Sequence, residues 1–222
     1  MVCLIGYASY ANGNYKTSVD FTITDPAFVT PAPTLSPKED EMSNYWRLQK
    51  NIDLSQWSSI KEMVKQEANF LDMDVRASYI TASAESRFIA NAKNVNGHNN
   101  IDSGAMQLNN GGAPVECYMG KTLKLGDGRS VKVTWKNYKT DARLNINMRL
   151  RKLKEYLEYC DGDYFGAYAM YNCGESYGKY LKGKRGALEV IKVLRARGNN
   201  QGANNIKNNF WVQYNKYINM EV

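Results

Sequence analysis

The sequence predicts a mainly α-helical fold with a small β-hairpin insertion and an extended N-terminal arm. Three observations predict it. Apolar residues recur at three- and four-residue steps over most of the chain after residue 55, as the buried faces of helices require. One later segment alternates apolar and polar residues around a Gly-rich turn, which is typical of a hairpin. Four of the five prolines lie in the first 42 residues, where they oppose helix formation.

The N-terminal part differs in composition from the rest, so we divide the chain into an arm or linker over residues 1–42 and a domain over residues 43–222. The prolines of the arm are Pro26, Pro31, Pro33 and Pro37. Proline lacks the amide donor and restricts the residue before it. We therefore expect residues 25–37 to be extended, with one strand near Ser18 to Thr24. The arm is either a flexible tail or a docking arm for a larger assembly.

Two helices are predicted at the start of the domain. The first begins at Ser55 and carries one apolar stripe, formed by Trp57, Ile60, Val64, Ala68 and Leu71. The second covers Val75 to Phe88, and its apolar side is formed by Ala77, Ile80, Ala84 and Phe88. Residues 91–100 are rich in Asn and Gly, so we expect a loop there.

A β-hairpin is predicted within an insertion at about residues 111–138. Residues 122–125 and 131–135 alternate apolar and polar side chains around a Gly-Asp-Gly turn. Helical spacing resumes after Asp141, a suitable N-cap, with an apolar stripe formed by Ile146, Leu150, Leu153 and Leu157. Later helices are expected at Tyr164 to Tyr171, near Ala187 to Arg197 and near Ala203 to Tyr217.

Composition limits the classes of function. No run of about 18 apolar residues occurs, so we expect no transmembrane segment. The net charge of +7 favours polyanions such as nucleic acid, anionic lipid or bacterial cell wall, but no nucleic-acid-binding motif is present, so we expect no nucleic-acid partner. The four cysteines lack Cys-x-x-Cys spacing and His98 is the only histidine, so we expect no metal site and no cofactor. Buried free thiols are the favoured state of the cysteines, with disulfides as the alternative.

Glu85 is the main candidate for chemistry. It lies near the end of a mostly apolar predicted helix, close to Phe88 and Ile89. An apolar setting disfavours the charged form of a carboxyl and raises its pKa, so such a group can donate a proton near neutral pH. The alternative for this segment taken alone is a solvated glutamate on an amphipathic helix.

Four short motifs occur in a fixed order: Glu85-Ser86, Gly104-Ala105-Met106-Gln107, Asn145-Ile146-Asn147 and Tyr171-Asn172-Cys173-Gly174. In this order the chain resembles the soluble lytic transglycosylase and goose-type lysozyme family, over roughly residues 55–185. The resemblance implies a lysozyme-like helical domain of the α+β type. Three features depart from the family pattern: Cys173 stands for a small alanine, Asn109-Asn110-Gly111-Gly112 follows the second motif, and the hairpin is inserted.

The resemblance also implies roles for the residues of the motifs. Glu85 is expected to be the catalytic acid and then the base, and Ser86 to orient it or contact substrate. Three residues are expected to line the glycan groove, namely Gly104, Met106 and Gln107. Tyr171 is expected to place its hydroxyl near Glu85, and Asn172 to hold the turn or bind an acetamido group. The alternatives are core packing for Met106 and Tyr171, and hydrogen bonds to loop backbone for Gln107 and Asn172.

The activity implied by the resemblance is cleavage of the β-1,4 bond between N-acetylmuramic acid and N-acetylglucosamine, with formation of a 1,6-anhydro ring. Hydrolysis of the same bond is the close alternative, with Asp102 as the candidate second acid; the other interpretation of Asp102 is an Asx-turn before Gly104. A non-catalytic module that binds the cell wall is an alternative from a different class. A cysteine or serine hydrolase built on His98 with Cys117 or Cys173 is a third.

The expected partner is the glycan strand of peptidoglycan, which lies in the periplasm or cell wall. The N-terminus lacks the basic and long apolar regions of a secretory signal. We therefore expect delivery within a phage virion, through a lysis pore or through a secretion machine. The Pro-rich arm favours attachment to a virion or a secretion assembly.

Overall fold

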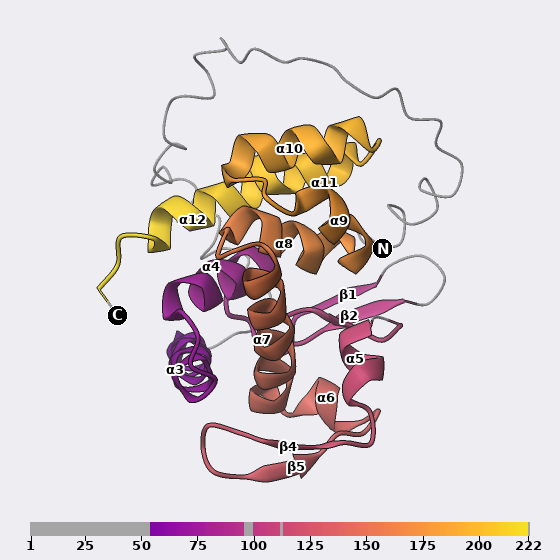
Figure 1. The fold of residues 1–222 in the computed structure, drawn as a ribbon. Coiled ribbons are helices and arrows are strands. Elements are labelled where there is room, and N and C mark those ends of the chain that lie inside the picture. Colours follow the sequence, from indigo (N-terminus) through magenta and orange to yellow (C-terminus); the bar gives the residue numbers. More distant parts are fainter. Residues whose placement is uncertain (1–53, 96–99, 112, 222) are drawn as a thin grey trace. The chain divides into compact units, whose positions relative to one another are not determined.

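The computed structural model describes residues 54–95, 100–111 and 113–221 (Figure 1). The arm expected over residues 1–42, its strand near Ser18 to Thr24, and His98 lie outside the described residues. The described chain forms two compact units, one made of residues 54–155 with 216–221 and the other of residues 156–215. Helices predominate and the sheets are small and antiparallel, which confirms the predicted fold class.

The first unit begins with helices α3 (Leu54–Phe70) and α4 (Val75–Ser86). The stripe predicted for α3 is buried at Ile60, Val64 and Ala68. Helix α4 starts at the N-cap Asp74, whose carboxylate accepts a hydrogen bond from the Arg76 amide at 2.8 Å. Ten of its twelve residues are buried, so α4 is a core helix and not an amphipathic surface helix.

Helix α4 ends two residues earlier than predicted. Arg87 and Phe88 both adopt the left-handed conformation, with φ of 57° and 62°, and this stops the α-helical hydrogen-bond ladder. The buried ring of Phe88 still belongs to the core, which is why its apolar character extended the predicted helix past its true end.

A three-stranded antiparallel sheet follows, formed by β1 (Lys93–Val95), β2 (Ile101–Ser103) and β3 (Leu108–Asn109). The loop predicted over residues 91–100 is therefore wrong at residues 93–95. All three side chains of β1 are exposed, so this edge strand has no apolar alternation that could indicate it. Its pairing with β2 holds it by backbone hydrogen bonds.

The insertion contains the predicted hairpin, formed by β4 (Thr122–Lys124) and β5 (Ser130–Lys132), with Leu123 opposite Val131. It also contains two short helices that the sequence did not indicate, α5 (Ala113–Tyr118) and α6 (Asn137–Thr140). The buried side chains of the insertion form one apolar cluster with Leu108 of β3 and with Leu144 and Met148. The insertion is thus part of the core of the first unit.

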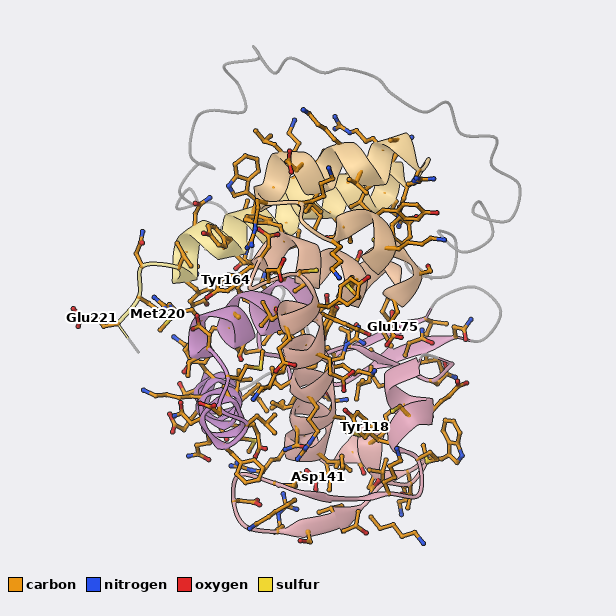
Figure 2. All side chains as sticks on the ribbon, in the orientation of Figure 1. Tyr118, Asp141, Tyr164, Glu175, Met220 and Glu221 are labelled. Atoms are coloured by element: carbon orange, nitrogen blue, oxygen red, sulfur yellow. The ribbon has the colours of Figure 1, made fainter. Side chains whose placement is uncertain are left out.

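Helix α7 (Ala142–Tyr159) begins in the first unit and ends in the second. Asp141, labelled in Figure 2, is the predicted N-cap: its carboxylate accepts a hydrogen bond from the Leu144 amide at 3.0 Å. Ile146, Leu150 and Leu153 of the predicted stripe are buried. Arg151 donates a hydrogen bond to the Lys124 carbonyl of the hairpin, and Lys154 donates one to the Leu71 carbonyl in the α3–α4 turn.

The second unit is helical. Its elements after α7 are α8 (Tyr164–Cys173), the 3-10 turn η3 (Glu175–Tyr177), α9 (Gly178–Leu181), α10 (Gly186–Ala196), α11 (Asn200–Asn205), the π-helical turn η4 (Ile206–Phe210) and α12 (Trp211–Tyr217). Its core is aromatic, with the rings of Tyr168 and Phe210 stacked at 3.9 Å. The helix predicted near residues 203–217 is confirmed, but a π-helical turn interrupts it.

Candidate active site

Glu85 occupies the one acidic position of helix α4. Of the twelve residues of this helix, only Arg76 and Glu85 are not fully buried. The neighbours of Glu85 include Ala84, Ser86 and Phe88, which are 8%, 7% and 1% exposed. Glu85 is therefore a partly exposed residue at the edge of an apolar core, and a proton donor must be open to its substrate in this way.

The chain turns sharply directly after Glu85. Arg87 and Phe88 are consecutive non-glycine residues with positive φ, a costly conformation that is found preferentially at functional sites. The Arg87 guanidinium donates a hydrogen bond to the Ser83 carbonyl. The Phe88 ring contacts the edges of the Tyr79 and Tyr217 rings, at 5.8 and 6.1 Å between centroids. These contacts fix the end of α4.

Lys61 contacts two rings of this aromatic cluster, those of Tyr79 and Tyr217. The Lys61 ammonium group sits 5.1 Å from the centre of the Tyr79 ring and 5.5 Å from that of Tyr217. Burial lowers the pKa of Lys61, and the nearby Lys216 lowers it further. Its aromatic contacts place Lys61 among the groups that support the end of α4.

Ser86 connects α4 to the second motif. Its hydroxyl donates a hydrogen bond to the Ala105 carbonyl at 2.6 Å and accepts one from the Ile89 amide at 3.1 Å. The first contact ties the loop of residues 104–107, which we call the motif loop, to the end of the helix that carries Glu85, and the second fixes the chain that leaves this helix. Ser86 itself is 7% exposed, so its clearest role is to position this loop.

Asn145 of α7 holds the motif loop from the other side. Its side-chain oxygen accepts a hydrogen bond from the Met106 amide at 3.1 Å. Its side-chain nitrogen donates to the carbonyls of Ser103 and Tyr138, at 2.9 and 3.1 Å. Asn145 is 1% exposed, so all three bonds are made away from water. Asn145 belongs to the third motif, but its role as the support of this loop was not predicted.

The conformation of the motif loop requires glycine at position 104. Gly104 has φ of +81°, and a Cβ atom there would lie 2.5 Å from the side chain of Asn145. The Gly104 amide donates to the Ala92 carbonyl at 2.8 Å. Larger residues would therefore displace either the loop or Asn145.

Met106 and Gln107 direct their side chains to the protein's own core and backbone. Met106 is fully buried. The Gln107 side-chain amide donates to the carbonyls of Gly104 and Ala92, at 2.9 and 3.2 Å, and Gln107 itself has φ of +47°. These are the packing and backbone roles that we considered as alternatives to groove lining. At these two positions the loop backbone is therefore the part that could contact a glycan. That Met106 and Gln107 line the glycan groove stays a prediction.

Asp102 lies in β2, where its carboxylate bonds across the sheet. One oxygen accepts a hydrogen bond from the Asn109 side chain at 2.7 Å, and the other accepts one from the Asn94 side chain at 3.4 Å. Both asparagines stand opposite Asp102 in the strand register. This arrangement was not anticipated, because the sheet itself was not predicted.

The fourth motif lies in the second unit, on α8. Tyr171 is 2% exposed and its ring stacks on that of Tyr168 at 5.8 Å. Asn172 is 9% exposed, and the Cys173 thiol donates to its side-chain oxygen at 3.7 Å. The expected approach of the Tyr171 hydroxyl to Glu85 joins two separately described units, so it stays a prediction.

The described residues contain no group of three or more His, Cys, Asp or Glu side chains placed to hold a metal ion. Nor does any described helix have the length and apolar character to cross a membrane. Cys160 and Cys173 are buried free thiols, and Cys117 is exposed. Burial raises the pKa of the Cys160 thiol to about 11, and Asp163 and Asp161 add to this, so the thiol stays protonated at neutral pH.

The site lies within a segment that matches a known protein family. The family model for the transglycosylase SLT domain matches residues 62–193, which is more than half of the chain. The match includes Glu85, the motif loop, Asn145 and the fourth motif. The comparisons with curated proteins and with solved structures found no match.

Proposed function

The chain belongs to the transglycosylase SLT domain family, and we propose that it is a lytic transglycosylase that cuts the bond between N-acetylmuramic acid and N-acetylglucosamine with Glu85 as its only acid and base. Family membership supports peptidoglycan cleavage of the lytic transglycosylase type in general. The catalytic residue and the product are our additions. The observation that carries them is the partly open Glu85 carboxyl at the edge of a buried helix, beside a loop fixed by Ser86 and Asn145.

The first step requires the acid form of Glu85. The carboxyl group donates its proton to the glycosidic oxygen, and the bond from that oxygen to C1 of N-acetylmuramic acid breaks. The positive charge that develops at C1 is stabilised by the acetamido oxygen of the same sugar, so no second enzyme carboxylate is needed.

The second step uses the carboxylate form. Glu85 takes the proton of the C6 hydroxyl while the C6 oxygen bonds to C1, which closes the 1,6-anhydro ring and restores the acid. The same residue therefore ends in the state in which it began. No water is consumed, because the C6 hydroxyl of the same sugar takes the place of water at C1.

The motif loop contributes by position. Its backbone is tied to the end of α4 through Ser86 and to α7 through Asn145, so two hydrogen bonds fix its position relative to the helix that carries Glu85. Fixed geometry of this kind lowers the entropic part of the barrier, and small displacements can reduce the rate about 100-fold. Ser86 and Asn145 act through the loop and are positioning residues.

The environment of Asp102 favours the transglycosylase over the hydrolase. A hydrolase with two carboxylates needs the second one free to activate water or to attack the sugar. Each oxygen of Asp102 accepts a hydrogen bond from an asparagine side chain, and these bonds hold the carboxylate to its own sheet. Asp102 is thereby better suited to support the sheet than to act as a base.

Digestion of purified peptidoglycan by the wild type and by Glu85→Gln tests the proposal, with mass spectrometry of the fragments. Gln keeps the size of the side chain but cannot donate or regain the proton. We expect anhydro-muramic ends from the wild type and no fragments from the variant. Reducing muramic ends would contradict the transglycosylase product, and cleavage by Glu85→Gln would contradict the assignment of Glu85.

We propose that the enzyme is carried in a phage virion and acts on peptidoglycan in the periplasm or cell wall. The support for this is the Pro-rich composition of residues 1–42, which suits a docking arm. Deletion of residues 1–42 is expected to preserve peptidoglycan cleavage and to abolish incorporation into the virion. Incorporation of the shortened protein would show that the arm is not the docking element.

A further inference from the structure

The hairpin insertion carries an excess of exposed positive charge. Residues 121–139 contain six cations and one acid, Asp127. All six cations are exposed: Lys121, Lys124, Arg129, Lys132, Lys136 and Lys139. Asp127 is already paired with Arg129 at 2.7 Å and with Arg143 at 3.2 Å. None of the five lysines forms an ion pair within the part of the chain that the structure describes, so their charge is available to a partner.

The outward face of the hairpin combines these charges with hydroxyl groups. Thr122 and Lys124 of β4 and Ser130 and Lys132 of β5 are exposed, while Leu123 between them is buried. In the register of the hairpin, Lys132 stands opposite Thr122 and Lys124 opposite Ser130. Each lysine therefore neighbours a hydroxyl group and not the other lysine. We call these four exposed residues the hairpin face.

An exposed aromatic residue adjoins the hairpin face. Trp135 is 55% exposed, the highest exposure among the large aromatic side chains that the structure describes. It lies in a turn closed by two reciprocal hydrogen bonds: the Thr134 amide donates to the Asn137 side chain at 2.7 Å, and the Asn137 amide donates to the Thr134 hydroxyl at 3.1 Å. Its ring contacts the edge of the fully buried Tyr138. Trp135 is thus held outward on a rigid support.

The hairpin is fixed to the body of the first unit. The Gly126 amide at its turn donates to the buried Glu67 carboxylate at 2.9 Å. The Lys124 carbonyl accepts hydrogen bonds from Arg151 and Asn147 of α7, at 3.1 and 3.3 Å. Figure 1 shows the hairpin at the end where α7 begins. A preformed surface of this kind loses little conformational entropy when it binds a ligand.

We propose that the hairpin face, together with Trp135, is a second binding surface for the peptidoglycan strand, separate from the Glu85 site. The proposal rests on the proposed function, which supplies the substrate. The carboxylates of the stem peptides along the strand match the exposed lysines, sugar hydroxyls match Thr122 and Ser130, and an exposed tryptophan ring can stack on the apolar face of a sugar. The surface lies in the same compact unit as Glu85.

Binding to intact, insoluble peptidoglycan tests the proposal, with every variant made in the Glu85→Gln background so that the polymer is not cut. The variants are Lys124→Gln/Lys132→Gln and Trp135→Ala in the full chain. The matched controls lie in the second unit: Lys182→Gln/Lys184→Gln removes the same charge from exposed sites, and Tyr159→Ala removes another exposed aromatic ring. Circular dichroism checks that each variant is folded.

We expect the lysine pair to weaken binding about tenfold at low salt, and this loss to vanish at about 0.5 M salt, where charges are screened. Trp135→Ala is expected to weaken binding about fivefold at both salt concentrations. The controls are expected to bind like the parent. Parent-like binding by both hairpin variants would overturn the proposal, and so would an equal loss in the controls.

Two further measurements distinguish this surface from the catalytic site and from a nucleic-acid-binding surface. Cleavage of short soluble glycans by otherwise wild-type protein with the hairpin substitutions should be unchanged, since these substrates do not reach a second surface. If the wild type cuts nothing but the hairpin variants still lose binding, the proposed function fails and the binding surface stands. Binding to duplex DNA is compared with binding to peptidoglycan from which attached phosphate-containing polymers have been removed. If the hairpin variants lose affinity for the DNA and keep their affinity for this peptidoglycan, the surface recognises nucleic acid and the proposal is wrong.

Discussion

Two buried polar side chains of the first unit hold two different segments against α7, and they do so with different chemistry. Asn145 forms neutral hydrogen bonds with three backbone groups, namely the Met106 amide of the motif loop and the carbonyls of Ser103 and Tyr138. Glu67, which is fully buried, holds the hairpin through its charge: it bonds to Arg143 at 2.8 Å, to Asn147 at 2.7 Å and to the Gly126 amide at 2.9 Å. The loop that follows β2 is thus held by a neutral amide, and the turn of the hairpin is held by a carboxylate.

The difference has a physical consequence for the site. A charged group close to Glu85 would shift the pKa of the carboxyl on which the mechanism depends. A neutral amide can fix the motif loop without adding a net charge to the site. The hairpin has no such restriction, and a buried carboxylate with three donors holds it firmly provided that every donor stays in place. The two networks therefore predict different results when each is broken.

Glu67→Ala is expected to have the largest effect on stability. It leaves Arg143, with only 12% of its side chain exposed, paired with Asp127 alone, and it removes the acceptor for Gly126. Breaking a buried ion pair on one side costs about 3–5 kcal/mol. Urea denaturation measures the change. A loss below about 1 kcal/mol would show that the hairpin does not depend on this carboxylate.

Asn145→Ala is expected to cost less stability and more activity. Loss of three buried hydrogen bonds, with some compensation by water, should lower the free energy of unfolding by about 2–3 kcal/mol. Because the motif loop is then free to shift relative to Glu85, kcat should fall about 100-fold while KM changes little. Steady-state kinetics well below the melting temperature measures both. An equal loss of kcat in Glu67→Ala would remove the distinction between the two networks.

Tyr118 of the insertion, labelled in Figure 2, gives a smaller effect that depends on pH. Burial raises its pKa to about 12, with the Glu155 charge as a lesser cause. The neutral phenol is favoured in the folded state, so its contribution is complete below pH 10 and is lost as the pH rises toward 12. We expect the free energy of unfolding to fall by about 2 kcal/mol over this range, and Tyr118→Phe to remove that part of the loss. The same slope in both proteins would contradict the prediction.

Local patterns were sufficient to predict the longer helices and the hairpin, but not the short helices α5, α6 and α9. The stripe of α3, the cap at Asp141 and the alternation around the Gly-rich turn each depend on neighbours in sequence. The edge strand β1 escaped prediction because Lys93, Asn94 and Val95 are all exposed, and only pairing with β2 makes them a strand.

The candidate site shows the same difference between features that local sequence predicts and features that depend on contacts between distant segments. Glu85 and Ser86 are adjacent, so a motif can include them. The partners of Asn145 cannot be read from a motif, because Met106 lies 39 residues away in sequence. The carboxylate of Asp102 is bonded to Asn94 and Asn109 only because three strands meet. The candidate acid could therefore be found from local sequence, whereas the groups that position its surroundings depend on the folded chain.

A comparison of Glu85→Gln with Asp102→Asn tests most directly whether one carboxylate performs both steps. Both substitutions replace a carboxylate with an amide of the same shape, and the cleavage rate is measured on the same peptidoglycan. We expect Glu85→Gln to lower the rate by at least about 1000-fold, in the range of a lost general acid, and Asp102→Asn to change it by less than about fivefold. A comparable loss in Asp102→Asn would mean that two carboxylates take part, which would contradict the single-acid mechanism.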